Sequence, residues 1–423
     1  MPLDPRIETC RGCAAAAPEL VLDLGLKPRA DGLQPSRGLA LSADRCPLEL
    51  ALCPLCGLLQ LLETPVPSVL FGEQFRYYSS LNPDLVTHAE RLADDLVQRL
   101  GLDQSSRVIE LASNDGYLLR PFARRGLSVL GVDPAPGPAA AARMAGIETI
   151  QAFFDRDLAE RLLEQGRSAD LIVANNVLAH VPDPVDFLIG VARLLRPGGT
   201  AVFEVAWGRS LLQAMAFDQI YHEHHCYFTA GALSRLLSRT GLALLDIEPL
   251  PIHAGSLRVF AARSGRPSAR VDALVRLEQA EGLDRAETWR SMARRLSTLR
   301  RSLREMLERA RAEGHALAAY GAAAKGTMLL NWLQPEPDWI PWVADINPHK
   351  QGRFVPGVGI PVVSPARIVQ DRPDRLLLLP WNWAAEIARD QQQWLADGGR
   401  FIVPLPTPRL YPWIDRLADQ SPD

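Results

Sequence analysis

The segment DQIYHEHHCYF holds the densest group of side chains that could do chemistry: Tyr221, His222, Glu223, His224 and His225. Histidine titrates near neutral pH, and a neighbouring acid or phenol can orient it, so the segment predicts a general acid or base. The alternative is a catalytic metal, but the H-E-x-x-H spacing of a helical zinc site is absent from this segment.

A second polar group follows the apolar run at Arg107–Leu111 and comprises Glu110, Ser113, Asn114, Asp115 and Gly116. Asp133 ends the next apolar run, and this order of strand, tight turn, helix, strand and acid is typical of a nucleotide-binding βαβ half. The turn has neither the G-x-G-x-x-G of dinucleotide sites nor a P-loop. Its single glycine suits a nucleoside without phosphates, such as S-adenosylmethionine (SAM). A Rossmann strand that binds nothing is the alternative.

The run Asp170–Asn175 predicts a further buried strand, which ends in Asn175 and Asn176 and is followed by His180. Ligands of open α/β sheets bind beyond the carboxyl ends of the strands, near the switch in strand order. We therefore expect these residues to line a wall of the cofactor cleft. A helix expected at Pro184–Leu195 and a strand at Thr200–Val205 fit a class I methyltransferase core.

Two C-x-x-C pairs, Cys10/Cys13 and Cys53/Cys56, each present two thiolates from a tight turn. Together they predict a tetrahedral Zn(II) site that contributes to folding. Four thiolates leave no open position on the metal, so the site is expected to be structural rather than catalytic. Cys46 is a rival ligand with a poorer spacing, and reduced core cysteines without metal are the alternative.

The C-terminal part predicts a second Rossmann-like sheet, with strands at Ala316–Tyr320, Trp339–Asp345, Arg375–Leu379 and Arg400–Val403. Lys325 follows a Gly/Ala turn that opens a helix, and such helix N-termini bind anions. Asn347 and Lys350 follow the second strand. A site for a phosphate-bearing substrate is one interpretation, and a domain that covers the cleft is the other.

A long helix is predicted before this region, because apolar residues recur at three- and four-residue intervals. Its stripe consists of Trp289, Met292, Leu296, Leu299, Leu303, Met306 and Ala310. We expect the stripe to pack on a neighbouring domain, and a coiled-coil dimer seam is the alternative.

The composition is that of a soluble globular protein, with 47% hydrophobic and 22% charged residues among 423. A net charge of −3 argues against nucleic acid or an anionic membrane as the main partner. Neither a signal peptide nor a membrane span is indicated, so a cytoplasmic location is expected. The expected domains are residues 1–75 (zinc-binding), 76–265 (SAM-binding), 266–314 (helical connector) and 315–423 (Rossmann-like, substrate-binding).

Taken in order, CxxC…CxxC, ELASNDGYLL, NNVLAHVPD, IYHEHHCYF, HAGSLRVF, YGAAAKG and ADINPHKQGRFVPG resemble the sugar C-methyltransferase family of deoxysugar pathways. The resemblance covers nearly the whole chain. It implies an α/β protein with a small N-terminal zinc-binding domain, a class I methyltransferase domain and a second Rossmann-like domain. It also implies SAM and structural Zn(II) as cofactors.

The resemblance further implies methylation of a nucleotide-linked 4-keto-deoxysugar at the carbon next to the ketone, through base-catalysed enolisation. Tyr221, Glu223 and His224 match the family's YHEH segment, and Tyr77 matches its upstream Y-x-S-S tyrosine. We expect His224 to be the base, helped by Tyr77 or Tyr221, with Glu223 orienting. The expected substrate-binding residues are His180, His222, His225, Lys325, Asn347 and Lys350.

Two departures from the family pattern are expected to touch the acceptor pocket: Cys226, a small and reactive group, and the segment Leu81–Asp84. For Tyr77 and the neighbouring aromatic and hydroxyl groups of the connector, the alternative to a role in catalysis is packing. The expected partner is a small molecule, and the chain is expected to be a monomer or homodimer. Rival functions are an N- or O-methyltransferase on the same scaffold, a zinc-knuckle protein that binds RNA or a partner, and a non-catalytic subunit.

Overall fold

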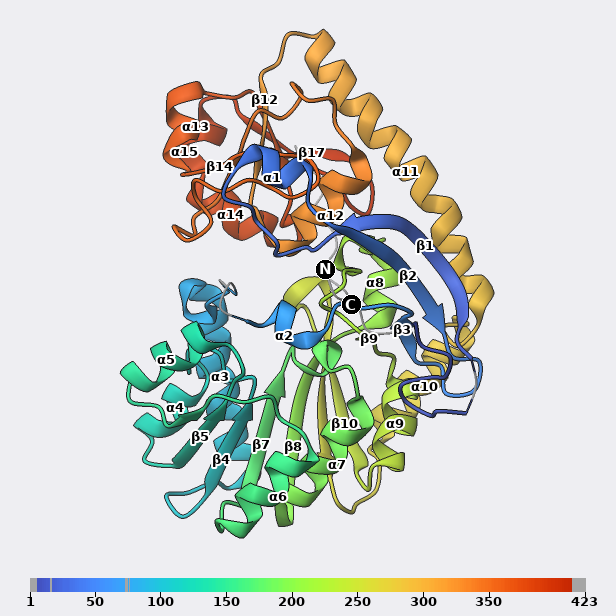
Figure 1. Ribbon diagram of the computed structural model, residues 1–423, viewed down its shortest axis with the longest axis vertical. Helices are drawn as coiled ribbons and strands as arrows, with labels where there is room; N and C mark the ends of the chain where they lie inside the picture. Colours follow the sequence, from blue (N-terminus) through green and yellow to red (C-terminus); the bar gives the residue numbers. More distant parts are fainter. Residues whose placement is uncertain (1–5, 16, 73–74, 76, 413–423) are drawn as a thin grey trace. The chain divides into compact units, whose positions relative to one another are not determined.

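The computed structural model describes residues 6–15, 17–72, 75 and 77–412 (Figure 1). Its contacts divide the chain into two compact units, each built from three stretches of sequence. The first comprises Met1–Val21, Leu50–Ser210 and Glu223–Thr288, and the second comprises Leu22–Glu49, Leu211–His222 and Trp289–Asp423. The boundary therefore passes between His222 and Glu223. The four-domain division by sequence order stays a prediction.

The first unit contains a seven-stranded sheet in the order β10-β11-β8-β7-β4-β5-β6. All neighbouring strands are parallel except β11, which is antiparallel to both β8 and β10. This arrangement is the class I methyltransferase sheet that the sequence predicts. Its strands are β4 (Arg107–Leu111), β5 (Ser128–Val132), β6 (Thr149–Ile150), β7 (Ala169–Asn175), β8 (Leu195–Ala206), β10 (Ala243–Leu250) and β11 (Ser256–Ala262).

Helices cover both faces of this sheet, because adjacent residues of each central strand point to opposite sides. Val108 of β4 packs with α3 (Pro83–Leu100), α4 (Leu119–Arg124) and α5 (Pro136–Met144). Ile109 packs in a second cluster with α6 (Arg156–Glu164), α7 (Pro184–Leu194) and α9 (Ala230–Arg239). The apolar runs predicted as buried strands are therefore confirmed as the centre of the core.

The segment Leu81–Asp84 begins α3. The Asn82 side chain accepts hydrogen bonds from the amides of Asp84 and Leu85 at 3.0 and 3.2 Å, and Pro83 occupies the first helical position. Asparagine and proline are favoured at these two positions because the first amides of a helix lack intrahelical partners. The structure thus gives this departure from the family pattern a helix-capping role.

The N-terminal region forms a four-stranded sheet in the order β1-β2-β3-β9. Its strands are β1 (Glu19–Pro28), β2 (Arg45–Leu52), β3 (Leu59–Leu61) and β9 (Cys226–Tyr227), and its helices are α1 (Arg37–Leu41) and α2 (Pro67–Leu70). In the pairing of β3 with β9, Leu59 lies opposite Tyr227 and Gln60 opposite Cys226. The zinc-binding region is thereby joined to the strand that directly follows the histidine-rich segment.

The second unit contains a six-stranded sheet in the order β14-β13-β12-β15-β16-β17, parallel except for β17. The strand order switches between β12 and β15, as in a Rossmann fold. Its elements are β12 (Leu317–Tyr320), α12 (Ala324–Leu333), β13 (Val343–Ala344), β14 (Val362–Val363), α13 (Ala366–Asp371), β15 (Arg375–Leu378), α14 (Ala384–Asp390), α15 (Gln392–Ala396), β16 (Arg400–Val403) and β17 (Arg409–Tyr411). The second Rossmann-like sheet is thus confirmed, although the strand predicted at Trp339–Asp345 covers only Val343–Ala344.

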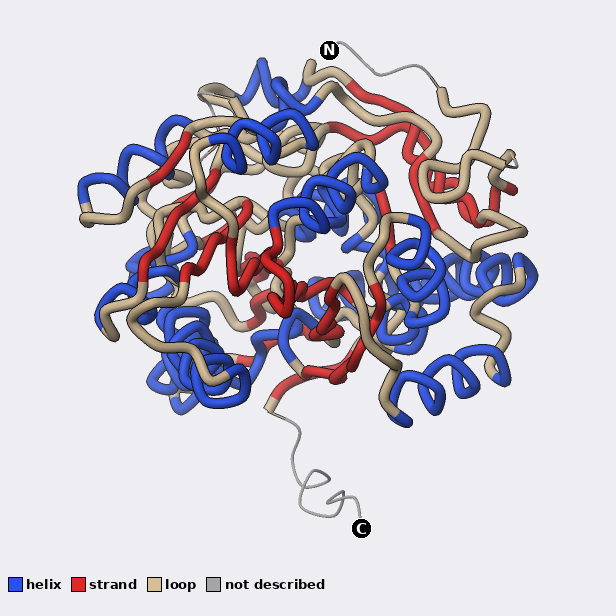
Figure 2. The backbone as a smooth tube through the Cα atoms, turned by 90° about the horizontal axis from the view of Figure 1, so that it is seen from below, coloured by secondary structure: helices blue, strands red, loops and turns tan. Residues whose placement is uncertain are grey.

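The long helix predicted from the apolar stripe is α11 (Ala286–Ala312), which follows α10 (Ala269–Ala280). Figure 2 shows the helices in blue against the strands in red. Trp289, Met292, Leu296 and Leu303 of the stripe are at most 4% exposed within one chain. Because these side chains are already covered, the structure favours the packed helix over a dimer seam. No helix in the described part of the chain is long and apolar enough to cross a membrane.

Candidate active site

The turn between β4 and α4 holds a conformation that is uncommon for residues with side chains. Ala112, Asn114 and Gly116 have φ angles of 58°, 50° and 77°. Left-handed residues other than glycine are strained and concentrate at functional sites. The amide of Asn114 donates to Asp133 Oδ2 at 2.8 Å, so the acid at the end of β5 holds the turn in place.

Several buried atoms at this turn lack hydrogen-bond partners among the described residues. They are Glu110 Oε2, Ser113 Oγ and Asp115 Oδ1, and Asn175 Oδ1 at the end of the neighbouring β7 shares this property. Buried polar atoms are rarely left unsatisfied, so this group indicates a place for a polar ligand. The strand order switches between β4 and β7, which is where such sheets bind ligands. The hydroxyl, amino and ammonium donors of SAM fit these acceptors.

The electrostatics of the turn favour a cationic ligand. Burial raises the pKa of Glu110 well above its ordinary value, and the nearby carboxyls of Asp133 and Asp115 raise it further. Burial also raises the pKa of Asp133 to about 6. Acidic groups gathered with little solvent gain from a positive charge, and SAM carries one on its sulfonium and one on its ammonium group. Asn176, with φ 54°, continues from β7, and its amide donates to the Glu204 carbonyl at 2.7 Å.

The connector that carries Tyr77 is bound to this turn. Asn114 Nδ2 donates to the Tyr77 carbonyl at 3.1 Å, and Asn114 Oδ1 accepts from the Ser79 amide at 2.9 Å. The Ser80 hydroxyl donates to Asp115 Oδ2 at 2.5 Å. Tyr77 itself is 42% exposed, which a pure packing role does not explain. Arg76 of the same connector lies outside the described residues.

His224 lies beside His180, with their ring centroids 4.6 Å apart. Nδ1 of His180 donates to the Glu223 carbonyl at 2.6 Å, since a carbonyl oxygen can only accept. His180 follows the carboxyl end of β7, and the amide of His225 donates to the Ala179 carbonyl at 2.6 Å. The structure therefore brings Glu223 and His224 to the carboxyl end of β7, the end of the sheet that also carries the turn after β4, which we call the SAM turn after its predicted ligand. Tyr221 belongs to the second unit.

His222 and His225 are fully buried. His222 Nε2 donates to the Pro47 carbonyl at 3.0 Å, within the second unit. The ring nitrogens of His225 have no hydrogen-bond partner in the described part of the chain. Burial lowers the pKa of both imidazoles, so both are neutral near pH 7.

Cys226, expected as a reactive group in the acceptor pocket, is also fully buried. Burial raises its pKa to about 12, so the thiolate is almost absent at neutral pH. The expectation of a reactive thiol at this position is wrong, because Cys226 belongs to β9 and its side chain is packed in the hydrophobic core.

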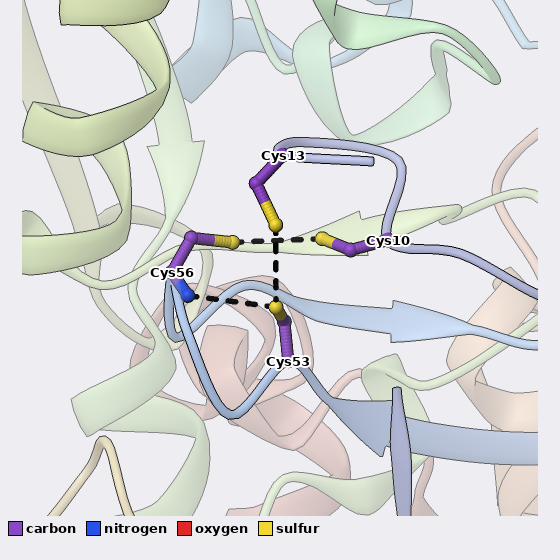
Figure 3. Close-up of side chains that lie close together, drawn as sticks. All are labelled: Cys10, Cys13, Cys53 and Cys56. Carbon is purple, nitrogen blue, oxygen red and sulfur yellow. Dashed lines mark hydrogen bonds between the residues drawn. The ribbon is translucent and has the colours of Figure 1, made fainter. Parts of the chain in front are cut away.

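The four predicted zinc ligands converge, as Figure 3 shows. The sulfurs of Cys10, Cys13, Cys53 and Cys56 all lie within 4.8 Å of one another, with 3.5 Å between Cys10 and Cys56 and 3.6 Å between Cys13 and Cys53. Zinc–sulfur bonds of about 2.3 Å place the ligands of a tetrahedral site roughly 3.8 Å apart, so the set fits Zn(II). Cys46 is not part of this group.

Gln60 connects this thiolate cluster with β9. Its Nε2 donates to Cys10 Sγ at 3.2 Å, and its Oε1 accepts from the Arg11 amide at 2.8 Å. Arg11 in turn donates to the Pro182 carbonyl at 2.8 Å, beyond His180. Hydrogen bonds to ligand sulfurs orient metal ligands and tune their affinity. Sequence reasoning missed Gln60, for which the only signal is its place just after the second cysteine pair.

In the second unit, two of the expected substrate-binding residues, Lys325 and Lys350, lie near the turn after β12. Lys325 Nζ donates to Asn382 Oδ1 at 2.6 Å and lies 5.5 Å from the Trp381 ring centroid. Lys350 Nζ donates to the Ala322 carbonyl at 2.9 Å. Asn347 lies one turn before Lys350, and its side chain accepts from the His349 amide at 2.9 Å.

Three family models match successive parts of the chain. They describe a putative zinc binding domain at residues 10–71, a methyltransferase domain at 85–247 and a C-methyltransferase C-terminal domain at 251–406. The C-methyltransferase NovU of Streptomyces niveus is 36% identical over 96% of this chain and 97% of its own length. The chain belongs to the C-methyltransferase family.

Other matches of this C-methyltransferase cover less of it. A ubiquinone biosynthesis O-methyltransferase of Ruegeria pomeroyi is 27% identical over 41% of the chain and 76% of its own length. A magnesium protoporphyrin IX methyltransferase from Synechocystis, solved with bound SAM, is 16% identical over 47% of this chain and 89% of its own, with a TM-score of 0.33.

The family membership confirms several expectations. The chain is an enzyme, a SAM-dependent C-methyltransferase with a zinc-binding N-terminal region. The class I sheet and the four-cysteine group agree with this assignment. The roles of individual residues in catalysis and substrate binding stay predictions.

Proposed function

We propose that this C-methyltransferase acts on a nucleotide-linked 4-keto-deoxysugar and methylates the carbon next to the ketone. The observation that carries the proposal is the placement of His224. Its half-buried ring lies against His180, in the unit that also holds the SAM turn. A base at this place can serve a reaction that must first remove a proton from carbon.

The ketone makes the neighbouring C–H acidic, because the electron pair left behind is delocalised onto the carbonyl oxygen. His224 accepts this proton, and the resulting enolate carbon forms the new C–C bond. Bound SAM supplies the electrophilic methyl group, and the sulfur keeps the electrons of the broken bond. His180 and Glu223 hold His224, because the His180 ring contacts it and the Glu223 carbonyl anchors His180. Tyr221 and Tyr77 are the candidates to assist the base or the enolate oxygen.

We assign substrate contact to His180. Within the second unit, we assign binding of an anionic ligand such as a phosphate to the cations Lys325 and Lys350, with Asn347 as a hydrogen-bonding neighbour. His222 and His225 are fully buried, so we assign them to support of the segment rather than to direct contact.

The test uses a nucleotide 4-keto-deoxysugar in D2O, with S-adenosylhomocysteine in place of SAM. Enzyme-dependent deuterium entry beside the ketone, reduced at least about 100-fold in His224→Ala, is expected for a general base. His315→Ala, a control in the connection between α11 and β12, should show deuterium entry at the normal rate. Normal exchange in His224→Ala would refute the base assignment.

Methyl transfer to oxygen or nitrogen without exchange would overturn the proposed reaction, and NMR of the product locates the methyl group. The full-length match to a C-methyltransferase favours carbon, because the O-methyltransferase match spans only 41% of the chain.

A further inference from the structure

Three of the residues proposed for catalysis, Tyr221, Glu223 and His224, are carried by an excursion of the chain between β8 and α9, residues 208–229. Its middle, Leu211–His222, belongs to the second unit, and its two ends belong to the first. The ends meet, because the Gly208 amide donates to the Phe228 carbonyl at 2.7 Å and Trp207 forms a bridge with Phe228. The excursion therefore leaves and re-enters the first unit at one place, which we call the neck.

One buried carboxylate binds both sides of the neck. Glu278 of α10 is 3% exposed, and its Oε1 accepts from Trp207 Nε1 at 2.7 Å and from the Ala230 amide at 2.8 Å. Its Oε2 accepts from the Gly231 amide at 3.0 Å. Trp207 is the last residue before the excursion, and Ala230 and Gly231 are the first after it. Hydrogen bonds to an ionised acceptor are among the strongest in proteins, particularly at a helix N-terminus.

An ion pair at the end of α10 reinforces the entry side. Arg209 donates to both carboxylate oxygens of Glu281 at 2.7 and 2.6 Å, and its guanidinium lies 5.3 Å from the Trp207 ring centroid. Glu278 and Glu281 lie at the end of α10, so one short stretch of this helix binds both sides of the neck. The helical connector, which the sequence predicts only as packing, thus contacts the excursion directly.

Bringing the two ends of a loop of this length together costs conformational entropy, and the hydrogen bonds at the neck offset that cost. Reacting groups must be held in near-attack geometry, and a small displacement of their support lowers the rate strongly. The neck lies beside β9, whose Cys226 follows the Glu223–His225 stretch. Because His224 precedes Phe228 of the neck closely in the chain, we expect a change at the neck to shift His224 through the backbone.

We propose that Glu278 is a positioning residue of the methyl-transfer reaction, which acts by clamping the two ends of the excursion that carries Tyr221, Glu223 and His224. The catalytic roles of these three residues rest on the proposed function. The clamp itself is defined by hydrogen bonds within the first unit and is measurable without a sugar substrate.

The test compares Glu278→Gln, Trp207→Phe and the control Asp272→Asn in the full-length, zinc- and SAM-loaded protein. The side-chain amide of Glu278→Gln keeps one acceptor oxygen. Its NH2 group then faces either the Gly231 amide, or Trp207 Nε1 together with the Ala230 amide, and so loses those hydrogen bonds. Amide hydrogen exchange in Glu278→Gln should accelerate about tenfold or more within residues 208–229, with the SAM turn unchanged. The SAM dissociation constant should stay within about twofold, kcat should fall about tenfold or more, and KM should change little. Asp272 is exposed on the same helix, so the control Asp272→Asn should leave amide exchange, SAM binding, kcat and KM unchanged.

Unchanged exchange in residues 208–229 of Glu278→Gln would overturn the clamp. Faster exchange with normal kcat would overturn its role in positioning. If Glu278→Gln loses protection throughout the first unit, Trp207→Phe decides, because it removes only one donor. Acceleration confined to residues 208–229 then supports the clamp, and unchanged exchange overturns it. Failure of the wild-type enzyme to enolise a 4-keto sugar would refute the proposed substrate. The amide hydrogen exchange result on the clamp would still stand, because it is measured without a sugar.

Discussion

His180 and His224 contact each other edge to face, with an interplanar angle of 61° and their ring centroids 4.6 Å apart. The Nδ1–H of His180 is directed to the Glu223 carbonyl, which fixes the tautomer that carries its proton on this nitrogen. His180 thus contacts the proposed base directly and also holds it through the backbone.

Replacement of His180 should therefore lower kcat, and by more when both the ring and the N–H donor are lost. His180→Asn keeps an N–H donor near the Glu223 carbonyl but loses the ring, and we expect kcat to fall about tenfold. His180→Ala loses both, and we expect about 100-fold, within the range of positioned acid–base groups. Steady-state turnover with saturating SAM measures the effect. Wild-type kcat in His180→Ala would contradict the assignment.

Replacement of Gln60 should weaken zinc binding without removing a ligand. Gln60→Leu retains the size of this buried side chain but loses the N–H that points at Cys10 Sγ. We expect zinc to transfer to a coloured chelator about tenfold faster, since outer hydrogen bonds contribute 10–100-fold in metal affinity. Gln165→Leu, at an exposed position, is the matched control. Equal rates of zinc release from wild type and Gln60→Leu would show that Gln60 does not stabilise the zinc site.

The buried acid Asp133 should impose a pH dependence on stability. Burial raises its folded-state pKa from 3.8 to about 6, so the folded protein binds this proton more tightly than the unfolded chain does. The stability associated with this group is complete below about pH 4 and is lost as the pH rises through 6, by about 3 kcal/mol in total. Urea unfolding of wild type and Asp133→Asn without SAM, between pH 4 and 8, isolates the difference. The same slope in both proteins would show that Asp133 does not titrate in this way.

Cys226 should resist alkylation in the native protein. With a pKa of about 12, only about one thiol in 10,000 is ionised at pH 8, and the side chain is also fully buried. Mass spectrometry after iodoacetamide treatment should find Cys226 unmodified in native protein and fully labelled in 6 M guanidinium chloride, roughly the concentration that unfolds most domains. Cys226→Ala should keep kcat within about twofold. Rapid labelling of Cys226 in the native protein, with loss of activity, would instead support the expectation that its thiol lines the acceptor pocket.

Local patterns in the sequence were sufficient for much of the fold. The run at Arg107–Leu111, its turn and Asp133 predict a strand, a ligand turn and an acid because all of their determinants lie within a few residues. Cys10, Cys13, Cys53 and Cys56 were predictable because metal ligands require a strict spacing. The same logic applies to Arg400–Val403, which forms β16 at the predicted residues.

Long-range contacts were not predictable in this way. Glu278 accepts from Trp207, 71 residues earlier, and nothing local marks either residue as a partner of the other. The pairing of β3 with β9 depends on strands of three and two residues, which are too short for a periodic pattern. Each compact unit also combines segments that are far apart in the sequence. Leu22–Glu49, for example, belongs to the same unit as the C-terminal part, and no local pattern indicates this.

The four cysteines belong to the same hydrophobic cluster as Ile109, Ile172 and Phe203 of the central sheet. The zinc-binding region is therefore not a detachable module. A chain truncated to begin at Ser79 would lose β3, leave the backbone groups of β9 unpaired and expose the apolar surface that the region covers. Unpaired strand edges of this kind promote self-association, so shortened or domain-swapped versions of this enzyme should aggregate rather than retain partial activity.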